Sequence, residues 1–360
     1  MRKKTKSRCY RIIYVLAAVL ISPAIIFGVS AADASRDSLF QLFSRSAPQS
    51  VVSRSFAGAG TAMPHDGFQG LVNPSLTTAP GGAGGVFSAG YGRGAVFDKL
   101  ALPFGAVFVE EGGAMGLYYR YLRGSQGDVH DAVVNFAGRL FEQVDAQGAV
   151  EFGLNIRYEQ SSWRREMWSA GVVDGVAGDD EIDGDGTDDG DMKTVRANSK
   201  NFLFDIGFYQ PHVYPGLDFS LVITNLFGYG WHDIDGEEET KTDDWTDGKR
   251  KTVIVGVLYT APVWSGLVLK IPLDIEMANL FTKSLPNKYV ARAGAEARIA
   301  GKYCVRFGYA YDAPESPVDM VANFDYRHLF FGGVGVSIKP VLIDFFAGKN
   351  EFGITATYTY

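Results

Sequence analysis

The side chains that could do chemistry form no catalytic or metal-binding pattern. The five histidines have neither the HxxEH nor the HExxH spacing of a zinc site, and no GxSxG nucleophile motif occurs. The run Asp183-Gly184-Asp185-Gly186 is similar to a calcium loop, but Thr187 and Thr194 stand where an EF-hand needs acidic ligands. We therefore expect no enzyme activity, no metal site and no cofactor.

Charged residues do recur at every second position of three consecutive stretches. Both signs occur side by side, which favours paired charges that brace a wall over a ring of one sign for ion selectivity. Arginine can also grip a carboxylate through two N–H groups, so Arg292 and Arg306 are candidates to meet an anionic head group. The residues leave both roles open. The positions concerned are Lys270, Asp274, Glu276, Arg292, Glu296, Arg298 and Arg306.

The stretches that carry these charges alternate strictly between apolar and polar residues. Such alternation is typical of strands with two different faces, and each run is about as long as a tilted strand that crosses a bilayer. Applied to the whole chain, the pattern predicts fourteen strands. They cover 84–91, 103–109, 113–123, 131–142, 149–160, 200–210, 217–227, 251–260, 266–277, 288–299, 303–312, 329–338, 341–346 and 352–360.

The connections between these strands alternate between short and long. A membrane barrel has short periplasmic turns and long outer loops in this order, whereas a soluble sandwich has no reason to keep such parity. The last strand ends on the aromatic Tyr360, and barrel closure would leave no aromatic edge exposed to water. We therefore predict an all-β fold, a transmembrane β-barrel of about fourteen antiparallel strands over 84–360. An ordinary C-terminal edge strand is the alternative.

Residues 1–31 have the layout of a secretory signal peptide. Residues 1–11 carry six Arg or Lys and no acid, 12–27 are almost wholly apolar, and small residues follow. The alternative is an uncleaved N-terminal anchor. Cleavage would remove Cys9 and leave Cys304 without an intrachain partner. The protein is therefore expected to be exported.

Charge is unevenly distributed along the chain. The formal net charge of −7 argues against nucleic acid as a partner. Residues 174–191 hold nine acidic and no basic side chains, and 233–247 hold eight acidic side chains and Lys241. Both runs fall in the two longest connections, so we predict long acidic outer loops at 161–199 and 228–250 on a nearly balanced barrel.

Residues 32–83 contain no alternating strand. This segment is too short for an independent domain with a good core. We predict that it forms a plug, or hatch, inside the barrel.

Two motifs stand near the two ends of the chain. The first consists of Gly58, Gly60 and Asp66, followed by Asn73-Pro74, and the second is the run from Arg306 to Pro314. They resemble the hatch signature and the late-strand motif of the FadL-type family of outer-membrane transporters for long-chain fatty acids and hydrophobic compounds. Ser75 stands where the family more often has Ala. The resemblance covers both ends of the chain, while the middle matches only as a strand pattern.

The resemblance implies a passive transporter in the outer membrane of a diderm bacterium. A hydrophobic ligand would be captured at an outer loop, held in an apolar pocket and released sideways into the bilayer. Phe68, Leu71 and Val72 are candidate pocket residues, although packing of the plug against itself is the plainer interpretation. The barrel-assembly machinery would read the C-terminal strand, and we expect a monomer. A surface adhesin or antigen using the long loops and a general porin are the alternative functions.

Overall fold

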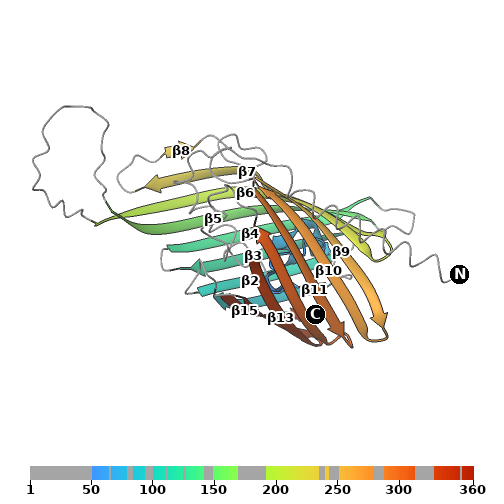
Figure 1. The fold of residues 1–360 in the computed structure, drawn as a ribbon. Coiled ribbons are helices and arrows are strands. Elements are labelled where there is room, and N and C mark those ends of the chain that lie inside the picture. The colour runs from blue at the N-terminus through green and yellow to red at the C-terminus, as the bar shows by residue number, and fades with distance from the viewer. Residues whose placement is uncertain are drawn as a thin grey trace, which may run out of the picture.

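The computed structural model describes residues 51–64, 66–78, 84–93, 100–110, 112–124, 127–141, 149–168, 192–234, 240–242, 251–278, 288–312, 328–348 and 351–360. Most of them belong to one antiparallel sheet (Figure 1). The predicted signal peptide (1–31), the first part of the predicted plug (32–50) and the acidic run 174–191 lie outside the described residues.

The strands follow one another around the sheet in chain order. Their bounds are β1 (Gly84–Arg93), β2 (Leu100–Glu110), β3 (Gly113–Arg123), β4 (Gly127–Phe141), β5 (Val150–Trp168), β6 (Met192–Tyr214), β7 (Leu217–Ile234), β8 (Thr240–Thr242), β9 (Thr252–Trp264), β10 (Leu267–Ala278), β11 (Lys288–Ile299), β12 (Tyr303–Asp312), β13 (His328–Ile338), β14 (Val341–Gly348) and β15 (Glu351–Thr359).

The sheet closes into a barrel. β1 pairs with both β15 and β2, and β6 pairs with both β5 and β7, so no break is left in the ring. The short β8 pairs with the end of β7 and takes no part in closure. The remaining fourteen strands form the wall, which confirms the predicted fourteen-stranded antiparallel barrel.

The two faces of the wall differ in chemistry. In β12, Val305 and Phe307 on the outer face are each 53% exposed, whereas Cys304 and Arg306 on the inner face are each 3% exposed. In β15 the inner face carries buried threonines and the outer face exposed apolar side chains. Apolar residues outside and polar residues inside are the arrangement of a barrel with a lipid-facing surface.

Strand residues occupy part of two predicted loops. Residues 161–168 and 192–199, assigned by prediction to the loop 161–199, are strand, and the β5–β6 ladder continues to Trp168 paired with Met192. Residues 228–234 likewise belong to β7 rather than to the loop 228–250. These strands project beyond their neighbours (Figure 1). The prediction missed the extensions because backbone pairing outside an apolar layer needs no apolar alternation.

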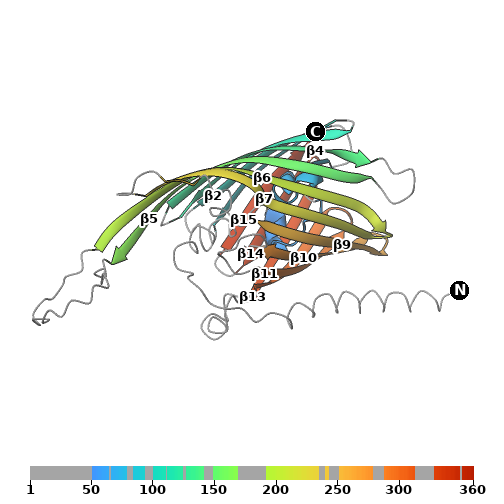
Figure 2. The ribbon, with the colours of Figure 1, turned by 90° about the horizontal axis from the view of Figure 1, so that it is seen from above.

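The residues ahead of β1 form short helical elements. These are α3 (Val51–Ser55), α4 (Gln69–Val72) and the 3-10 helix η2 (Pro74–Thr78). They lie on the inner side of the wall, seen in blue within the ring of strands in Figure 2. None of the helices in the described residues is long and apolar enough to cross a membrane.

Candidate functional site

The inner segment, defined as residues 51–78, reaches across the lumen. α3 packs against β12 to β15, whereas η2 packs against β2 to β6. Nearly all described side chains between these two contacts are buried. The segment therefore touches the wall on separate arcs of the barrel.

Asp274 on β10 holds the middle of the inner segment. Its Oδ2 accepts hydrogen bonds from the backbone N–H groups of Gly60 and Thr61 at 2.9 and 3.0 Å, and its Oδ1 accepts one from the Thr61 hydroxyl at 3.0 Å. The side chain is only 2% exposed. Three hydrogen bonds satisfy a carboxylate that would otherwise be costly to bury. Sequence analysis named Asp274 among the charges that could brace a wall but gave it no specific partner.

The dipeptide Asn73-Pro74 joins the segment to the opposite wall. Asn73 Nδ2 donates to the carbonyl of Thr61 at 2.8 Å, and Asn73 Oδ1 accepts from the Ser75 hydroxyl at 2.7 Å. An alanine at position 75 would have no hydroxyl group and could not donate this hydrogen bond. From β4, Asn135 Nδ2 donates to the Pro74 carbonyl at 3.0 Å.

A second asparagine, Asn155 on β5, donates to the carbonyl of Gly70 at 3.0 Å. Asn135 Nδ2 also lies 2.7 Å from Asn155 Oδ1, so the two wall residues support each other. Sequence analysis did not single out either asparagine. A buried amide on the polar face of adjacent strands was the signal that could have found them.

The predicted hatch residues have local conformational roles. Gly58 and Gly60 have φ values of +87° and +124°, which L-residues rarely adopt. Asp66 is buried, and its Oδ1 accepts a hydrogen bond from the backbone of Phe68 at 2.9 Å. The motif thus shapes the turns that bring the segment to its wall partners.

A belt of glycines on the inner face seats the segment. At each of these positions a Cβ atom would crowd an atom of the segment, so only glycine leaves room for the close approach. Two glycine pairs face each other directly across neighbouring strands. The belt consists of Gly105, Gly153, Gly207, Gly256, Gly294, Gly308 and Gly333.

Arg306 and Arg292 both bind carboxylates of the wall. Arg306 Nε lies 2.7 Å from Glu296 Oε2, and Arg306 Nη1 lies 2.6 Å from Asp344 Oδ1. Its side chain is 1% exposed, and its guanidinium lies over the ring of Phe56. Arg292 pairs with Glu276, and a Cβ atom at Gly58 would lie only 3.2 Å from Arg292 Nε. A ligand would have to displace these partners, so the geometry favours the bracing role of both arginines.

A second charge ladder lies on the inner face of β3 to β6. Arg120 pairs with Asp131, and Arg157 pairs with Asp205. All four side chains are mostly buried. Sequence analysis missed this ladder because its members lie on four different strands, each contributing a single charge to the network.

Phe68 and Leu71 pack against the wall rather than within the segment alone. They form an apolar cluster with inner-face residues of β1 to β4, and Val72 is also buried. The ring of Phe68 lies directly behind Gly105 of β2, whose missing side chain leaves only backbone at that point. The cluster comprises Phe68, Leu71, Val86, Val107, Val109, Tyr118 and Val133.

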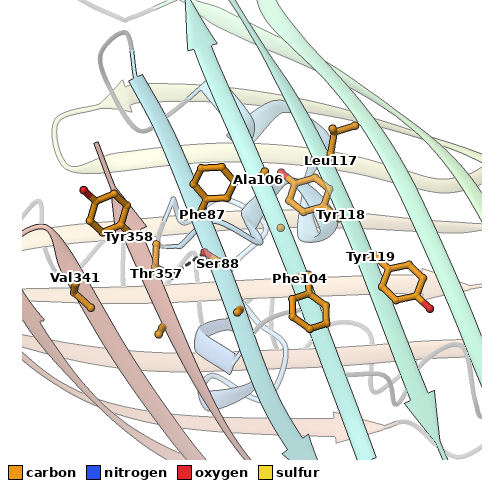
Figure 3. Close-up of a pocket in the computed structure, with 13 residues that line it drawn as sticks. Phe87, Ser88, Phe104, Ala106, Leu117, Tyr118, Tyr119, Val341, Thr357 and Tyr358 are labelled. Carbon is orange, nitrogen blue, oxygen red and sulfur yellow. Dashed lines mark hydrogen bonds between the residues drawn. The ribbon is translucent and has the colours of Figure 1, made fainter.

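An apolar groove lies on the outer face in front of Gly105 (Figure 3). It has a volume of about 640 Å³ and runs over β14, β15, β1, β2 and β3. Exposed aromatic side chains, among them Phe87, Phe104 and Tyr358, border the groove. Ala89 and Ala356, whose side chains are small, also line it. The groove and the Phe68 cluster therefore face each other across the backbone of β2.

The β1–β2 ladder has a gap beside this groove. Pairing runs from Gly84 with Val109 to Ala89 with Phe104 and resumes only at Gly92 with Ala101. Pro103 lies in the gap, where it has no N–H to donate. A similar gap in the β10–β11 ladder contains Pro272.

Within the described residues, no cluster of side chains has the composition of a metal site.

Comparisons with known proteins identify the fold. No family model matches the chain. No curated protein sequence matches it either. Solved structures do match, including the Pseudomonas putida toluene transporter TodX, with 10% identity, a TM-score of 0.54, and coverage of 85% of this chain and 97% of that chain.

Two further structures match over a similar extent. The Ralstonia pickettii toluene transporter TbuX has 14% identity and a TM-score of 0.53, covering 86% of this chain and 97% of that chain. A Pseudomonas aeruginosa FadL homologue has 11% identity and a TM-score of 0.54, with the same two coverages. At these identities the likeness concerns the fold.

Proposed function

We propose that the chain is an outer-membrane protein that lets hydrophobic molecules pass without an energy source, with long-chain fatty acids as the preferred ligands. The observation that carries the proposal is the position of Phe68. An apolar cluster inside the barrel is separated from an apolar outer groove only by the backbone at Gly105. A route of this kind suits a ligand that leaves water, because each buried CH₂ contributes about 0.8 kcal/mol.

The inner segment acts in this proposal as the plug, with the whole of 32–83 as the hatch domain. Its contacts with Asp274, Asn135 and the glycine belt support a fixed plug that blocks a straight aqueous path. Ligand would move around the plug and leave through the wall beside the gap at Pro103. The fold shared with toluene transporters and a FadL homologue supports the passage of hydrophobic molecules.

The cellular setting follows from the same proposal. Residues 1–31 direct export and are removed, the assembly machinery recognises β15, and the mature monomer lies in the outer membrane of a diderm bacterium. Its short turns face the periplasm and its long acidic loops face outward. The exposed apolar outer face supports insertion into a bilayer.

Uptake by proteoliposomes tests the proposal. The purified protein should accelerate entry of a labelled long-chain fatty acid over protein-free liposomes. Toluene should be tested in parallel because two of the similar structures are toluene transporters. Mass spectrometry of lipids extracted from the protein in neutral detergent should identify a hydrophobic ligand. The proposal would be refuted if no hydrophobic probe entered proteoliposomes faster than it enters protein-free liposomes.

Two other functions give different results. A general porin would pass small sugars in liposome swelling, which a plugged barrel should not. An adhesin would bind host components through its outer loops and would lose that binding when 174–191 is trimmed. Sugar passage in place of fatty-acid uptake would replace the proposed function with that of a porin.

A further inference from the structure

The outer face of β3 to β6 changes its chemistry in steps toward the end where β5 and β6 project beyond their neighbours (Figure 1). Residues paired in register form rows across these four strands, one residue from each strand. One row is apolar, and the next is aromatic apart from a single alanine. The two rows are Leu117, Val134, Ile156 and Phe204, followed by Tyr119, Ala132, Tyr158 and Phe202. This succession marks the edge of the apolar band.

The two rows beyond the aromatic one are polar. His130 and Lys200 belong to the nearer row and Arg123 to the farther one, and all three side chains are exposed. Two residues of a strand span about 7 Å, so these cations begin one such step outside the aromatic row. Lipid head groups occupy roughly 5–8 Å on each side of a hydrocarbon core, which is the same depth. The rows are Tyr121, His130, Gln160 and Lys200, followed by Arg123, Asp128, Ser162 and Asn198.

Two tyrosines position His130 on this face. The His130 Nδ1 lies 2.8 Å from the hydroxyl of Tyr119, and the centroid of its ring lies 4.8 Å from that of Tyr121. When the Tyr119 hydroxyl donates to Nδ1, the imidazole proton is on Nε2, which is then a hydrogen-bond donor. The same constellation recurs on β12 and β13 with Tyr309, Tyr311 and His328.

The projecting part of β5 and β6 continues the basic composition. Residues 160–168 and 192–200 together contain five Lys or Arg and one acidic residue. The ladder sets Arg164 directly opposite Arg196. Like charges directly opposite each other destabilise a strand pair, and an anion close to both offsets the repulsion. This part of the sheet is therefore suited to an anionic partner.

We propose that this face, the basic rim, binds the phosphate groups of anionic phospholipids in the leaflet around the projecting end of the barrel. The basic rim consists of Arg123, His130, Arg164, Arg196 and Lys200. Acyl chains of such a lipid lie on the apolar and aromatic rows while its phosphate meets the cations. Lysine reaches a phosphate on a long apolar stem, and arginine offers a directional pair of N–H groups.

The inference goes beyond the proposed function and shares with it only the insertion of the barrel in a bilayer. The excess of positive charge on the rim favours phosphatidylglycerol, which has a net negative charge, over zwitterionic phosphatidylcholine. The acidic run 174–191 of the chain itself is the competing source of negative charge, and the test separates the two.

Native mass spectrometry of the full mature protein in a neutral maltoside detergent tests the rim. The protein is mixed with equal amounts of phosphatidylglycerol and phosphatidylcholine that have the same acyl chains, and the ratio of the two singly bound lipids is measured. The variants are Arg123→Gln with Lys200→Gln and the conservative pair Arg123→Lys with Lys200→Arg. Lys302→Gln, in an exposed short turn at the other end of the barrel, is the control. Heat modifiability on gels verifies that each barrel is folded.

The parent protein should retain phosphatidylglycerol in preference to phosphatidylcholine. The double Gln variant should lower the ratio of the two bound lipids at least about fivefold, whereas the conservative pair and Lys302→Gln should keep it. Asp128→Asn should raise the ratio, because it removes a carboxylate 3.7 Å from Arg123. More ammonium acetate should lower the ratio in the parent, since salt screens exposed charges.

An unchanged ratio in the double Gln variant, or an equal fall in Lys302→Gln, would overturn the basic rim as a lipid site. A preference that is absent in the parent and appears only when 174–191 is trimmed would also overturn it, because the chain's own acidic run would then occupy the rim. Fatty-acid uptake by a protein without phospholipid preference would overturn the site and leave the proposed function standing. Preference without uptake of any hydrophobic probe would overturn the proposed function alone.

Discussion

At the scale of single residues, hydrogen bonds between wall and segment give the lumen its fixed arrangement. Asp274 is the clearest case because one side chain satisfies two backbone N–H groups and a hydroxyl of the segment. The resemblance pointed to Asn73 within the segment, and the Oδ1 of Asn73 accepts hydrogen bonds from the backbone N–H and the hydroxyl of Ser75. The wall partners of that motif escaped prediction, because hydrogen bonds between residues that are 61 to 214 positions apart leave no local pattern.

Substitution of Asp274 tests this arrangement. Asp274→Ala would leave the N–H groups of Gly60 and Thr61 buried without acceptors, which should cost about 2–4 kcal/mol of unfolding free energy. Urea unfolding of the barrel in detergent, followed by tryptophan fluorescence, measures the loss. The control is Asp128→Ala, since that carboxylate is 40% exposed and lies 3.7 Å from Arg123. Equal stability of both variants would contradict the assignment.

At the scale of elements, the strands could be predicted almost completely and the contacts between them only in part. The alternation of apolar and polar residues predicted all fourteen wall strands, because neighbouring residues of a strand face an apolar exterior and a polar lumen in turn. The prediction missed the extension of β5 and β6 because pairing outside an apolar layer needs no alternation of apolar and polar residues. The glycine belt was visible in the sequence as glycines on polar faces, as at Gly294 and Gly308, but its meaning required knowledge of what lies against it.

The belt can be tested at Gly308 of β12. Gly308→Ala would bring a methyl group against the backbone at Phe56 and Ala57, and the expected cost is about 1–3 kcal/mol. Gly332→Ala on β13 is the matched control, because its nearest neighbour would be 3.9 Å away. The same unfolding measurement should separate the two variants. A Gly308→Ala barrel as stable as the control would argue against tight seating of the segment.

The gap in the β1–β2 ladder can be tested at Pro103. Pro103→Val would restore a backbone donor and a residue that favours strands, so the wall beside the groove should become harder to open. Fatty-acid uptake by proteoliposomes should fall severalfold while the melting temperature stays or rises. Pro272→Val fills the other gap, on strands that do not line the groove, and should leave uptake unchanged. Similar uptake by both variants would remove the gap at Pro103 from the route.

At the scale of the whole molecule, the barrel combines an apolar exterior with a lumen that residues 51–78 of its own chain enter. The interior is crossed by the inner segment and lined with paired charges, so its polar character does not imply an open aqueous channel. The acidic residues of the chain are concentrated in 174–191 and 233–247, and the charges outside these runs and outside residues 1–31 are nearly balanced.

Removal of residues 32–83 tests this view of the lumen. Without the segment the interior would fill with water, so single-channel conductance in planar bilayers should rise sharply over that of the complete mature chain. The shortened barrel should remain heat-modifiable on gels because its strands pair only with one another. Unchanged conductance in a folded barrel would rule out the plug.

The glycine belt also has a consequence for biogenesis. The inner segment leaves the ribosome before every strand of the wall, yet its seats lie on strands from β2 to β13. The first described residues of the chain can therefore take their final place only when most of the barrel exists. Until then Phe56 and Phe68 lack the wall residues that bury them in the folded barrel, so the unassembled chain exposes both aromatic side chains.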